Sequence, residues 1–413
     1  MFLKFSRMKL SRLGPGIITG AADDDPSGIA TYSQAGAGFG LNFLWTAWVT
    51  FPLMAAVQET CARIGLVTRM GLAKIIKANY PRPVLYSTVC LLFIANVFNI
   101  GADISAIAAA VGLIVPINSY LIELIATLGI VISIIYLPYQ KIAGIFKWLA
   151  LVLLAYVITF FVVRVDYGKV LTAALLPDFS AVFTPNYLLV LMGVLGTTIS
   201  PYLFFWEASE ETEELKSNHR TVGSRTLVAE KEDTIIGMLY SNLVTFFIIA
   251  VTGSVLYSAG VTNITTAAEA ATALRPLAGD FAYVLFAIGI IGTGMLAIHI
   301  LAGSAGYAVS ETFGFSEGLN KKFNQAKSFY AVIIISVVLG FLLTFLGIPP
   351  MKYLLYSAVL NGLISPILIV IILLIANNKK IMGERVNGTI ENLLVIATLI
   401  LMTVCAVSLL LFR

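Results

Sequence analysis

Three consecutive aspartates, Asp23 to Asp25, lie inside an apolar stretch that runs from Leu13 to Phe39. As a helix, these 27 residues would extend about 40 Å, which is enough to cross a bilayer. An aspartate at the centre of a membrane helix costs about 2.5 to 3.5 kcal/mol on insertion scales, so three of them cannot face lipid. They must face protein, water or a cation. The acids therefore indicate a cation site within the membrane.

The residues that follow these aspartates predict a break in the helix. Pro26 has no amide hydrogen and disfavours helical geometry at Asp25, and Ser27 and Gly28 are weak helix formers. Non-helical backbone at membrane depth persists only where it is buried in protein or lines a cavity. A carboxylate next to freed backbone carbonyls is the type of site that holds a cation.

A second interruption is expected in the apolar stretch 186–208, where the residues 196–201 read GTTISP. Pro201 should break this span near its middle, as Pro26 breaks the first, and the two prolines are 175 residues apart. Paired interruptions at corresponding positions of two halves indicate an inverted-repeat secondary transporter with its site between the broken helices. The alternative is that each proline only kinks its helix.

The composition is that of a polytopic membrane protein. Hydrophobic residues make up 59% of the 413 residues and charged residues 12%, and the mean hydropathy is +0.94. The net charge of +4 comes mostly from loop lysines and arginines, so it indicates no nucleic-acid partner. The three cysteines lack metal-ligand spacing and are expected to be packing residues. The N-terminal segment shows no cleavage site of a signal peptide.

Hydropathy predicts about eleven spans. With the N-terminus in the cytoplasm, 21 of the 26 lysines and arginines fall in cytoplasmic segments and 5 outside, as the positive-inside rule requires. We therefore expect a multi-pass protein of the cell inner (plasma) membrane, with a cytoplasmic N-terminus and an extracytoplasmic C-terminus. The segment from Lys216 to Asp233 mixes charges and is typical of a flexible cytoplasmic connector. The acidic run that begins at Glu207 is typical of a solvated helix end.

Several stretches resemble the Nramp divalent-metal transporters, which have the LeuT-type inverted-repeat fold. The sequence DPSGIATYSQAGAGFG, Asp25 to Gly40, is similar to the first-helix motif of that family, DPGN followed by a QAGA-x-FG run. Further similar stretches are CARIGLVT from Cys61, AGSAGYAVSETFGF from Ala302 and KKIMGERVNG from Lys379. The resemblance extends in order over nearly the whole chain.

The resemblance implies an all-α polytopic fold of five plus five helices with one extra helix, in which helices 1 and 6 are broken. The expected boundaries are 12–166 for the first repeat, 186–376 for the second and 390–412 for the extra helix. Residues 1–413 then form a single transmembrane transporter domain.

Carried over residue by residue, the family's metal site falls on Asp25 and on the backbone carbonyl of Ala22, while Gly28 stands where the family has asparagine. On the sixth span the carbonyl residue is Thr197, and Ser200 stands where the family has methionine. Two expected side-chain ligands are therefore absent, including the only sulfur.

Loss of the thioether removes the means of rejecting hard ions, because oxygen ligands suit magnesium, calcium and manganese. Glycine at position 28 and serine at position 200 also predict a wider cavity than asparagine and methionine would leave. Magnesium usually keeps several of its waters when it binds, and Asp24 or Asp23 could hold those waters. This pattern resembles the Nramp-related magnesium transporters. We therefore expect import of Mg²⁺, with Mn²⁺ also accepted, by alternating access. The ion is the transported substrate, and we expect no cofactor and no obligatory protein partner.

The family's proton route is also altered. Its histidine positions on the sixth helix read Tyr202 and Glu207, and its acidic pair on the third helix reads Asp103 and Ala106. With most of the titratable relay missing, we expect uncoupled transport, with Glu207, Asp103 and Tyr202 along the ion path. A divalent cation entering a cell gains about 4.6 kcal/mol per 100 mV, so protons are not required.

Three alternatives remain open. The nearest is a proton-coupled Mn²⁺ or Fe²⁺ importer of the standard Nramp type. An amino-acid transporter of the same fold would turn helix N-termini toward a substrate carboxylate, which three aspartates disfavour. An enzyme, an intramembrane aspartyl protease, would need Asp25 and Asp103 as its pair. That class carries a Gly-x-Gly-Asp type motif, which Gly101-Ala102-Asp103 does not supply.

Overall fold

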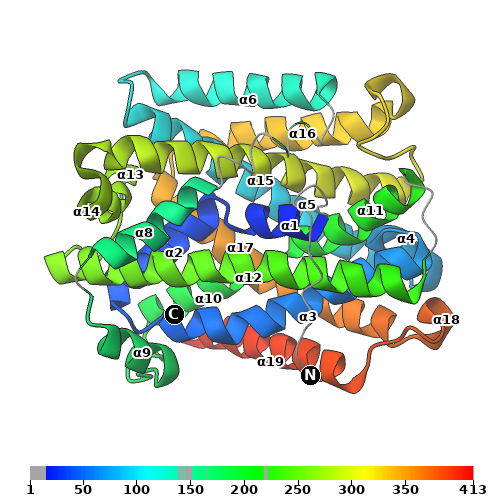
Figure 1. The fold of residues 1–413 in the computed structure, drawn as a ribbon. Helices are drawn as coiled ribbons and strands as arrows, with labels where there is room; N and C mark the ends of the chain where they lie inside the picture. Colours follow the sequence, from blue (N-terminus) through cyan, green and yellow to red (C-terminus); the bar gives the residue numbers. More distant parts are fainter. Residues whose placement is uncertain are drawn as a thin grey trace.

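The computed structural model describes residues 15–137, 151–163, 165–217 and 222–412, together with positions 141 and 144. All regular elements in these ranges are helices, which confirms the predicted all-α class. The long helices lie side by side across the molecule, with the short helices α9, α13 and α14 at one end and α4 and α18 at the other (Figure 1).

The described helices are α1 Pro15–Asp23, α2 Pro26–Phe39, α3 Leu44–Thr68, α4 Leu72–Asn79, α5 Arg82–Gly112, α6 Ser119–Tyr136, α8 Leu154–Val162, α9 Tyr167–Leu175, α10 Pro185–Thr198, α11 Pro201–Ser217, α12 Ser224–Val255, α13 Ala267–Ala271, α14 Arg275–Ala278, α15 Ala282–Phe313, α16 Lys327–Thr344, α17 Pro350–Ala376, α18 Lys379–Met382 and α19 Thr389–Leu411. Eight helical spans in the described part of the chain are long and apolar enough to cross a membrane. Two further helical segments, Leu151–Val162 and Tyr167–Leu175, are bent by 120° relative to each other, and they add a ninth span if they cross the membrane together. The count of eleven and the repeat boundaries remain predictions.

The first span is interrupted at Asp24 and Asp25, which separate α1 from α2. Asp25 has extended backbone geometry, with φ −68° and ψ 172°, and its Oδ1 accepts the N–H of Gly28 at 2.8 Å as the N-cap of α2. Pro26 occupies the first turn of α2, where a missing N–H costs nothing. The second half of the interrupted span thus begins as a normally capped helix, and its N-cap is the aspartate that we expect to bind the ion.

The second interruption separates α10 from α11 at Ile199 and Ser200. In a continuous helix the N–H of residue 201 would bond to the carbonyl of Thr197, but Pro201 has no N–H. The Ser200 hydroxyl donates to that carbonyl instead, at 2.6 Å, and also approaches the carbonyl of Gly196 at 3.1 Å. The carbonyl freed by the proline is therefore satisfied locally.

The interrupted spans touch their neighbours through glycines. A Cβ placed on Gly20 of α1 would lie 2.2 Å from the carbonyl oxygen of Gly237 in α12. Similarly, a Cβ on Gly196 of α10 would lie 2.0 Å from the carbonyl oxygen of Ala358 in α17. Such backbone contacts require small residues and are a typical form of helix packing in membranes. They hold both broken spans at the centre of the bundle.

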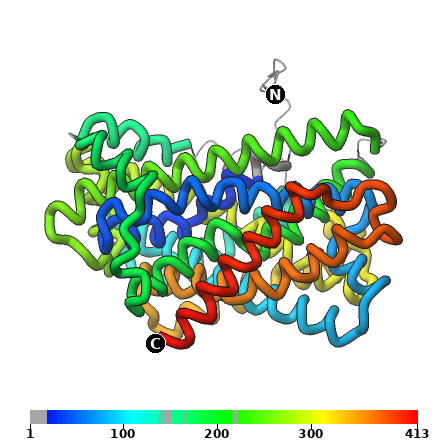
Figure 2. Tube along the Cα trace, turned by 90° about the horizontal axis from the view of Figure 1, so that it is seen from below, coloured from blue at the N-terminus to red at the C-terminus, as the bar shows by residue number. Residues whose placement is uncertain are grey.

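The last helix lies outside this central group. Figures 1 and 2 show α19 alongside α3 at the edge of the bundle. Only 22% of the residues in its most apolar stretch are buried within the protein. Its exposed side chains include Ile390, Leu393 and Ile400, which suit contact with lipid. This position agrees with a peripheral extra helix.

Candidate metal site between the interrupted helices

Asp25 lies at the centre of the bundle with 1% of its surface exposed. Its Oδ1 accepts hydrogen bonds from the Ser27 hydroxyl at 2.6 Å and from the N–H of Gly28 at 2.8 Å. Its Oδ2 accepts from Nδ2 of Asn99 on α5 at 3.1 Å. Ser357 of α17 donates in turn to Oδ1 of Asn99 at 2.8 Å. The Asp25 carboxylate is held by neutral donors, and no ion pair to it occurs within the described residues.

The start of α2 meets the end of α10 next to this carboxylate. The hydroxyl oxygens of Ser27 and Thr197 are 3.2 Å apart, and the Tyr32 hydroxyl lies 3.0 Å from that of Thr198. Gly28 faces the same place, because a Cβ added to it would lie 3.2 Å from Oγ1 of Thr197. The structure thus brings Asp25, Gly28 and Thr197 together, as the proposed site requires. The space at Gly28 is filled by Thr197 and Tyr32.

The carbonyl of Ala22 is freed by Pro26 in the same way that the carbonyl of Thr197 is freed by Pro201, because each lies four residues before a proline. The Tyr202 hydroxyl of α11 donates to the Ala22 carbonyl oxygen at 3.0 Å. Both of the backbone oxygens carried over from the family's site are therefore occupied by hydroxyls of the sixth span. Ser200 takes part through its hydrogen bond to Thr197, and its hydroxyl is directed back toward its own helix.

Asp23 and Asp24 turn toward α12. The Ser241 hydroxyl donates to Oδ2 of Asp23 at 2.6 Å and approaches Oδ1 of Asp24 at 3.2 Å. The second oxygen of each carboxylate is buried and has no hydrogen-bond partner within the described residues. These oxygens are available to hold water of a hydrated ion, although the structure directs both side chains to a helix other than those that surround Asp25.

Asp103 lies one helical turn beyond Asn99 on α5, on the same face. Neither oxygen of its carboxylate has a hydrogen-bond partner within the described residues, and its side chain is fully buried. Asn361 of α17 is buried with both side-chain polar atoms unpartnered in the same part of the chain. Buried polar groups are normally satisfied, so these side chains are candidate partners for water or for an ion on its path.

Glu207 is buried, in contrast to the solvated helix end that the acidic run predicts. Its Oε2 accepts a hydrogen bond from the Thr19 hydroxyl of α1 at 2.5 Å. The expected flexible connector is also wrong in part, since α12 begins at Ser224 and includes the buried Glu230. Glu230 and Asn99 were not predicted from the sequence, because an acid in a mixed-charge stretch and an amide in an apolar run have no distinctive spacing.

Two cavities lie at opposite ends of the bundle. One, of about 490 Å³, includes Lys74, Glu213 and Glu311 in its lining and lies beside α4. The other, of about 820 Å³, includes Gln34, Thr262 and Lys352 in its lining. None of the three aspartates lines either cavity. The carboxylate of Asp25 is therefore separated from both of these cavities.

An all-helical bundle with two interrupted spans around a buried carboxylate has the architecture of a LeuT-type membrane transporter. The chain belongs to the Nramp family, since the family model described as natural resistance-associated macrophage protein-like matches residues 16–412. Solved structures agree with this fold. A mutant of the manganese transporter from Eremococcus coleocola matches with a TM-score of 0.77 and 16% identity, over 95% of this chain and 84% of that chain.

More distant structures share the fold alone. MhsT in complex with L-phenylalanine matches with a TM-score of 0.59 and 12% identity, over 98% of both chains. Mhp1, a nucleobase-cation-symport-1 family transporter, matches with a TM-score of 0.57 and 14% identity, over 96% of this chain and 91% of that chain. These likenesses confirm the predicted LeuT-type class, and the family model confirms the resemblance to Nramp proteins.

Proposed function

We propose that this protein transports divalent metal cations, with Mg²⁺ as the main substrate and Mn²⁺ also accepted, by alternating access and without proton coupling. The observation that carries the proposal is the oxygen-only donor set at the interruption. It consists of the Asp25 carboxylate, the freed carbonyls of Ala22 and Thr197, and nearby hydroxyls. The metal enters as cargo, and its charge would be balanced by Asp25.

The donor chemistry favours hard cations. Carboxylate, carbonyl and hydroxyl oxygens are the ligands of magnesium, calcium and manganese, whereas sulfur favours softer metals. Ser200 stands where a methionine would supply sulfur, and Gly28 brings no ligating side chain. Magnesium dehydrates reluctantly and is often bound through one or two carboxylates and several waters. One charged ligand surrounded by neutral oxygens fits this requirement.

Two features support transport without protons. The sixth-span positions that carry histidine in the family are Tyr202 and Glu207, and Tyr202 is engaged as a donor to Ala22. Asp103 has no second acid at the position of Ala106. The membrane potential alone supplies about 4.6 kcal/mol per 100 mV for a divalent cation.

The orientation proposed from the charge distribution is also supported by the fold. Helices α4 and α18, whose lysines we expect in the cytoplasm, lie at one end of the bundle (Figure 1). Helix α9, which carries Lys169 on the expected outer side, lies at the opposite end. Placement in the plasma membrane with a cytoplasmic N-terminus is tested by labelling single cysteines in these helices with an impermeant reagent.

A proton-coupled Mn²⁺ or Fe²⁺ importer is the second candidate, and one observation favours it. The solved structures with TM-scores near 0.77 are manganese transporters. Asp103, buried near Asp25, would then be the remaining acid able to carry a proton.

Proteoliposomes loaded with a pH-sensitive dye distinguish the two candidates. We expect Mg²⁺ and Mn²⁺ to enter without acidifying the lumen at a clamped membrane potential, and Asp25→Asn to abolish uptake. Acidification that tracks uptake would establish coupling, and a preference for Fe²⁺ over Mg²⁺ would favour the second candidate.

A further inference from the structure

Three buried glutamates come together away from Asp25. Glu207 and Glu211 lie one turn apart on α11, and Glu230 faces them from α12. One carboxylate oxygen from each lies within 4.8 Å of the other two. All three residues are at most 7% exposed. Carboxylates this close repel one another strongly in a buried setting unless a cation or protons neutralise them.

The cluster, Glu207 with Glu211 and Glu230, has unused ligand oxygens. Oε1 of Glu207 and Oε2 of Glu230 are buried without a hydrogen-bond partner within the described residues. Their other oxygens each accept one hydroxyl, from Thr19 at 2.5 Å and from Thr234 at 2.7 Å. In both Glu207 and Glu230, one carboxylate oxygen thus accepts a hydrogen bond and the other does not.

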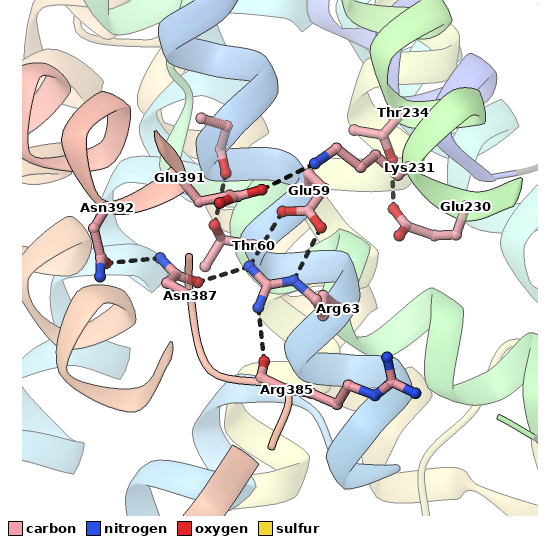
Figure 3. A network of polar contacts seen from close by, with 11 residues as sticks. Glu59, Thr60, Arg63, Glu230, Lys231, Thr234, Arg385, Asn387, Glu391 and Asn392 are labelled. Atoms are coloured by element: carbon pink, nitrogen blue, oxygen red, sulfur yellow. Dashed lines mark hydrogen bonds and ion pairs between the residues drawn. The ribbon is translucent and has the colours of Figure 1, made fainter. Parts of the chain in front are cut away.

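The nearby basic residues are engaged elsewhere, as Figure 3 shows. Arg63 pairs with Glu59 at 2.9 Å, and Lys231 pairs with Glu391 at 3.0 Å. In the part of the chain that the structure describes, no ion pair involves a glutamate of the cluster. A cation from solution would therefore be needed to neutralise the three carboxylates.

The position of the cluster suits an ion that leaves Asp25. Glu207 follows Ser200 by seven residues, about 10 Å along the helix that begins at the interruption. Thr19 of α1, the first half of the other broken span, contacts Glu207. The cluster thus lies where the inner halves of both interrupted spans meet α12, on the side that we expect to face the cytoplasm.

We propose that Glu207, Glu211 and Glu230 form a second binding site, for a hard divalent cation, between the Asp25 site and the cytoplasm. Its place on the transport route rests on the proposed function. In an octahedral shell with bonds of about 2.1 Å, opposite oxygens are about 4.2 Å apart, and calcium bonds of about 2.4 Å extend this to about 4.8 Å. Only one pair of the three oxygens can be opposite, and neighbouring oxygens of such a shell are about 3.0 to 3.4 Å apart, so binding draws the three carboxylates closer by rotation of their side chains, and water completes the shell.

The test counts Mn²⁺ ions bound to the purified full-length protein, from the loss of the free Mn²⁺ signal in electron paramagnetic resonance. We expect two ions for the wild type, one for Asp25→Asn, one for the double variant Glu211→Gln with Glu230→Gln, and none when all three changes are combined. Glu210→Gln is the matched control, because it removes an acid from the same helix outside the cluster, and it should still bind two ions.

Two results would overturn the site. One is a double variant that binds as many ions as the wild type, and the other is a wild type whose single ion disappears in Asp25→Asn. Each variant is first checked for a monodisperse elution profile. If the double variant aggregates, Glu230→Gln in the Asp25→Asn background is used, where loss of the Mn²⁺-induced rise in melting temperature supports the site and its persistence contradicts it.

The two proposals fail separately. If Asp25→Asn keeps both uptake and the number of bound ions, the proposed function at Asp25 is wrong. The double variant Glu211→Gln with Glu230→Gln leaves Asp25 unchanged, so the loss of one bound ion in that variant supports the glutamate site even if the function proposed for Asp25 is wrong.

Discussion

The Tyr202 hydroxyl donates a hydrogen bond to the carbonyl of Ala22 at 3.0 Å and so joins the two interrupted spans across the site. An ion that takes the Ala22 carbonyl as a ligand competes with this hydroxyl for the electron density of the same oxygen. Tyr202 is 1% exposed, so no bulk water replaces it in the closed state. The same bond therefore stabilises the metal-free protein and competes with the metal.

Tyr202→Phe tests this competition. We expect it to destabilise the metal-free protein by about 1 to 3 kcal/mol, because a buried carbonyl loses its donor. Saturating Mn²⁺ should recover part of the loss, since the ion then occupies the carbonyl. Melting temperatures with and without Mn²⁺ measure both effects. An equal loss in the two conditions would show that Tyr202 is only structural.

Asp25→Asn should separate binding from folding. Asparagine is as good an N-cap as aspartate, so α2 should still begin at Pro26. Removal of the charge should lower Mn²⁺ affinity at this site at least about tenfold, which corresponds to about 1.4 kcal/mol. Titration calorimetry measures it, with Asp178→Asn, an exposed aspartate, as the control. Unchanged affinity would remove Asp25 from the ligand set.

Ser200→Met should bring back a soft ligand at the second interruption. We expect Cd²⁺ to inhibit Mg²⁺ uptake at about tenfold lower concentration in this variant, because thioether sulfur prefers softer metals. Ser200→Leu has a similar size without sulfur, and it equally removes the hydroxyl that bonds to Thr197. Equal Cd²⁺ sensitivity in the two variants would exclude Ser200 from the site.

Arg63 should be a main determinant of stability. It makes two hydrogen bonds to Glu59, at 2.9 and 3.2 Å, and it donates to the Arg385 carbonyl and to Asn387, which join α3 to the segment before α19 (Figure 3). Arg63→Ala leaves a buried carboxylate without its partner, which typically costs about 3 to 5 kcal/mol.

Thermal unfolding in detergent measures the cost of this substitution. The exposed Arg82→Ala serves as the control and should leave the melting temperature unchanged. Adding Glu59→Gln to Arg63→Ala should restore part of the stability, and no recovery would show that the unpaired charge is not the cause.

Proline chemistry explains why the central part of the site was predictable. The resemblance to the family placed the carbonyls of Ala22 and Thr197 in the predicted site, and Pro26 and Pro201 explain why these two carbonyls lack a helical partner, since each proline removes one N–H. The partners of those carbonyls were not predictable. Tyr202 reaches Ala22 from 180 residues away, and Asn99 reaches Asp25 from 74 residues away. Such contacts depend on the rotation of packed helices, which hydropathy does not report.

The helical start of α12 was missed for a related reason. Its first turns carry charges in no apolar pattern, so the sequence resembles a loop there. Tertiary contacts hold it as a helix, including the Lys231–Glu391 pair at 3.0 Å. Polar helices of this kind are stabilised by their neighbours rather than by local propensity. Glu230 of the glutamate cluster lies on that helix, so the cluster could not be predicted from the sequence either.

The close approach of Gly20 to Gly237 limits how α1 can move. With no side chains between the two backbones, α1 cannot slide along α12 without lifting away from it, whereas it can swing about that point. Thr19 is adjacent to Gly20 and bonds to Glu207. We therefore expect α1 to pivot near Gly20, so that Thr19, next to the pivot, moves least and keeps its bond to Glu207 while the end of α1 at Asp23 moves further.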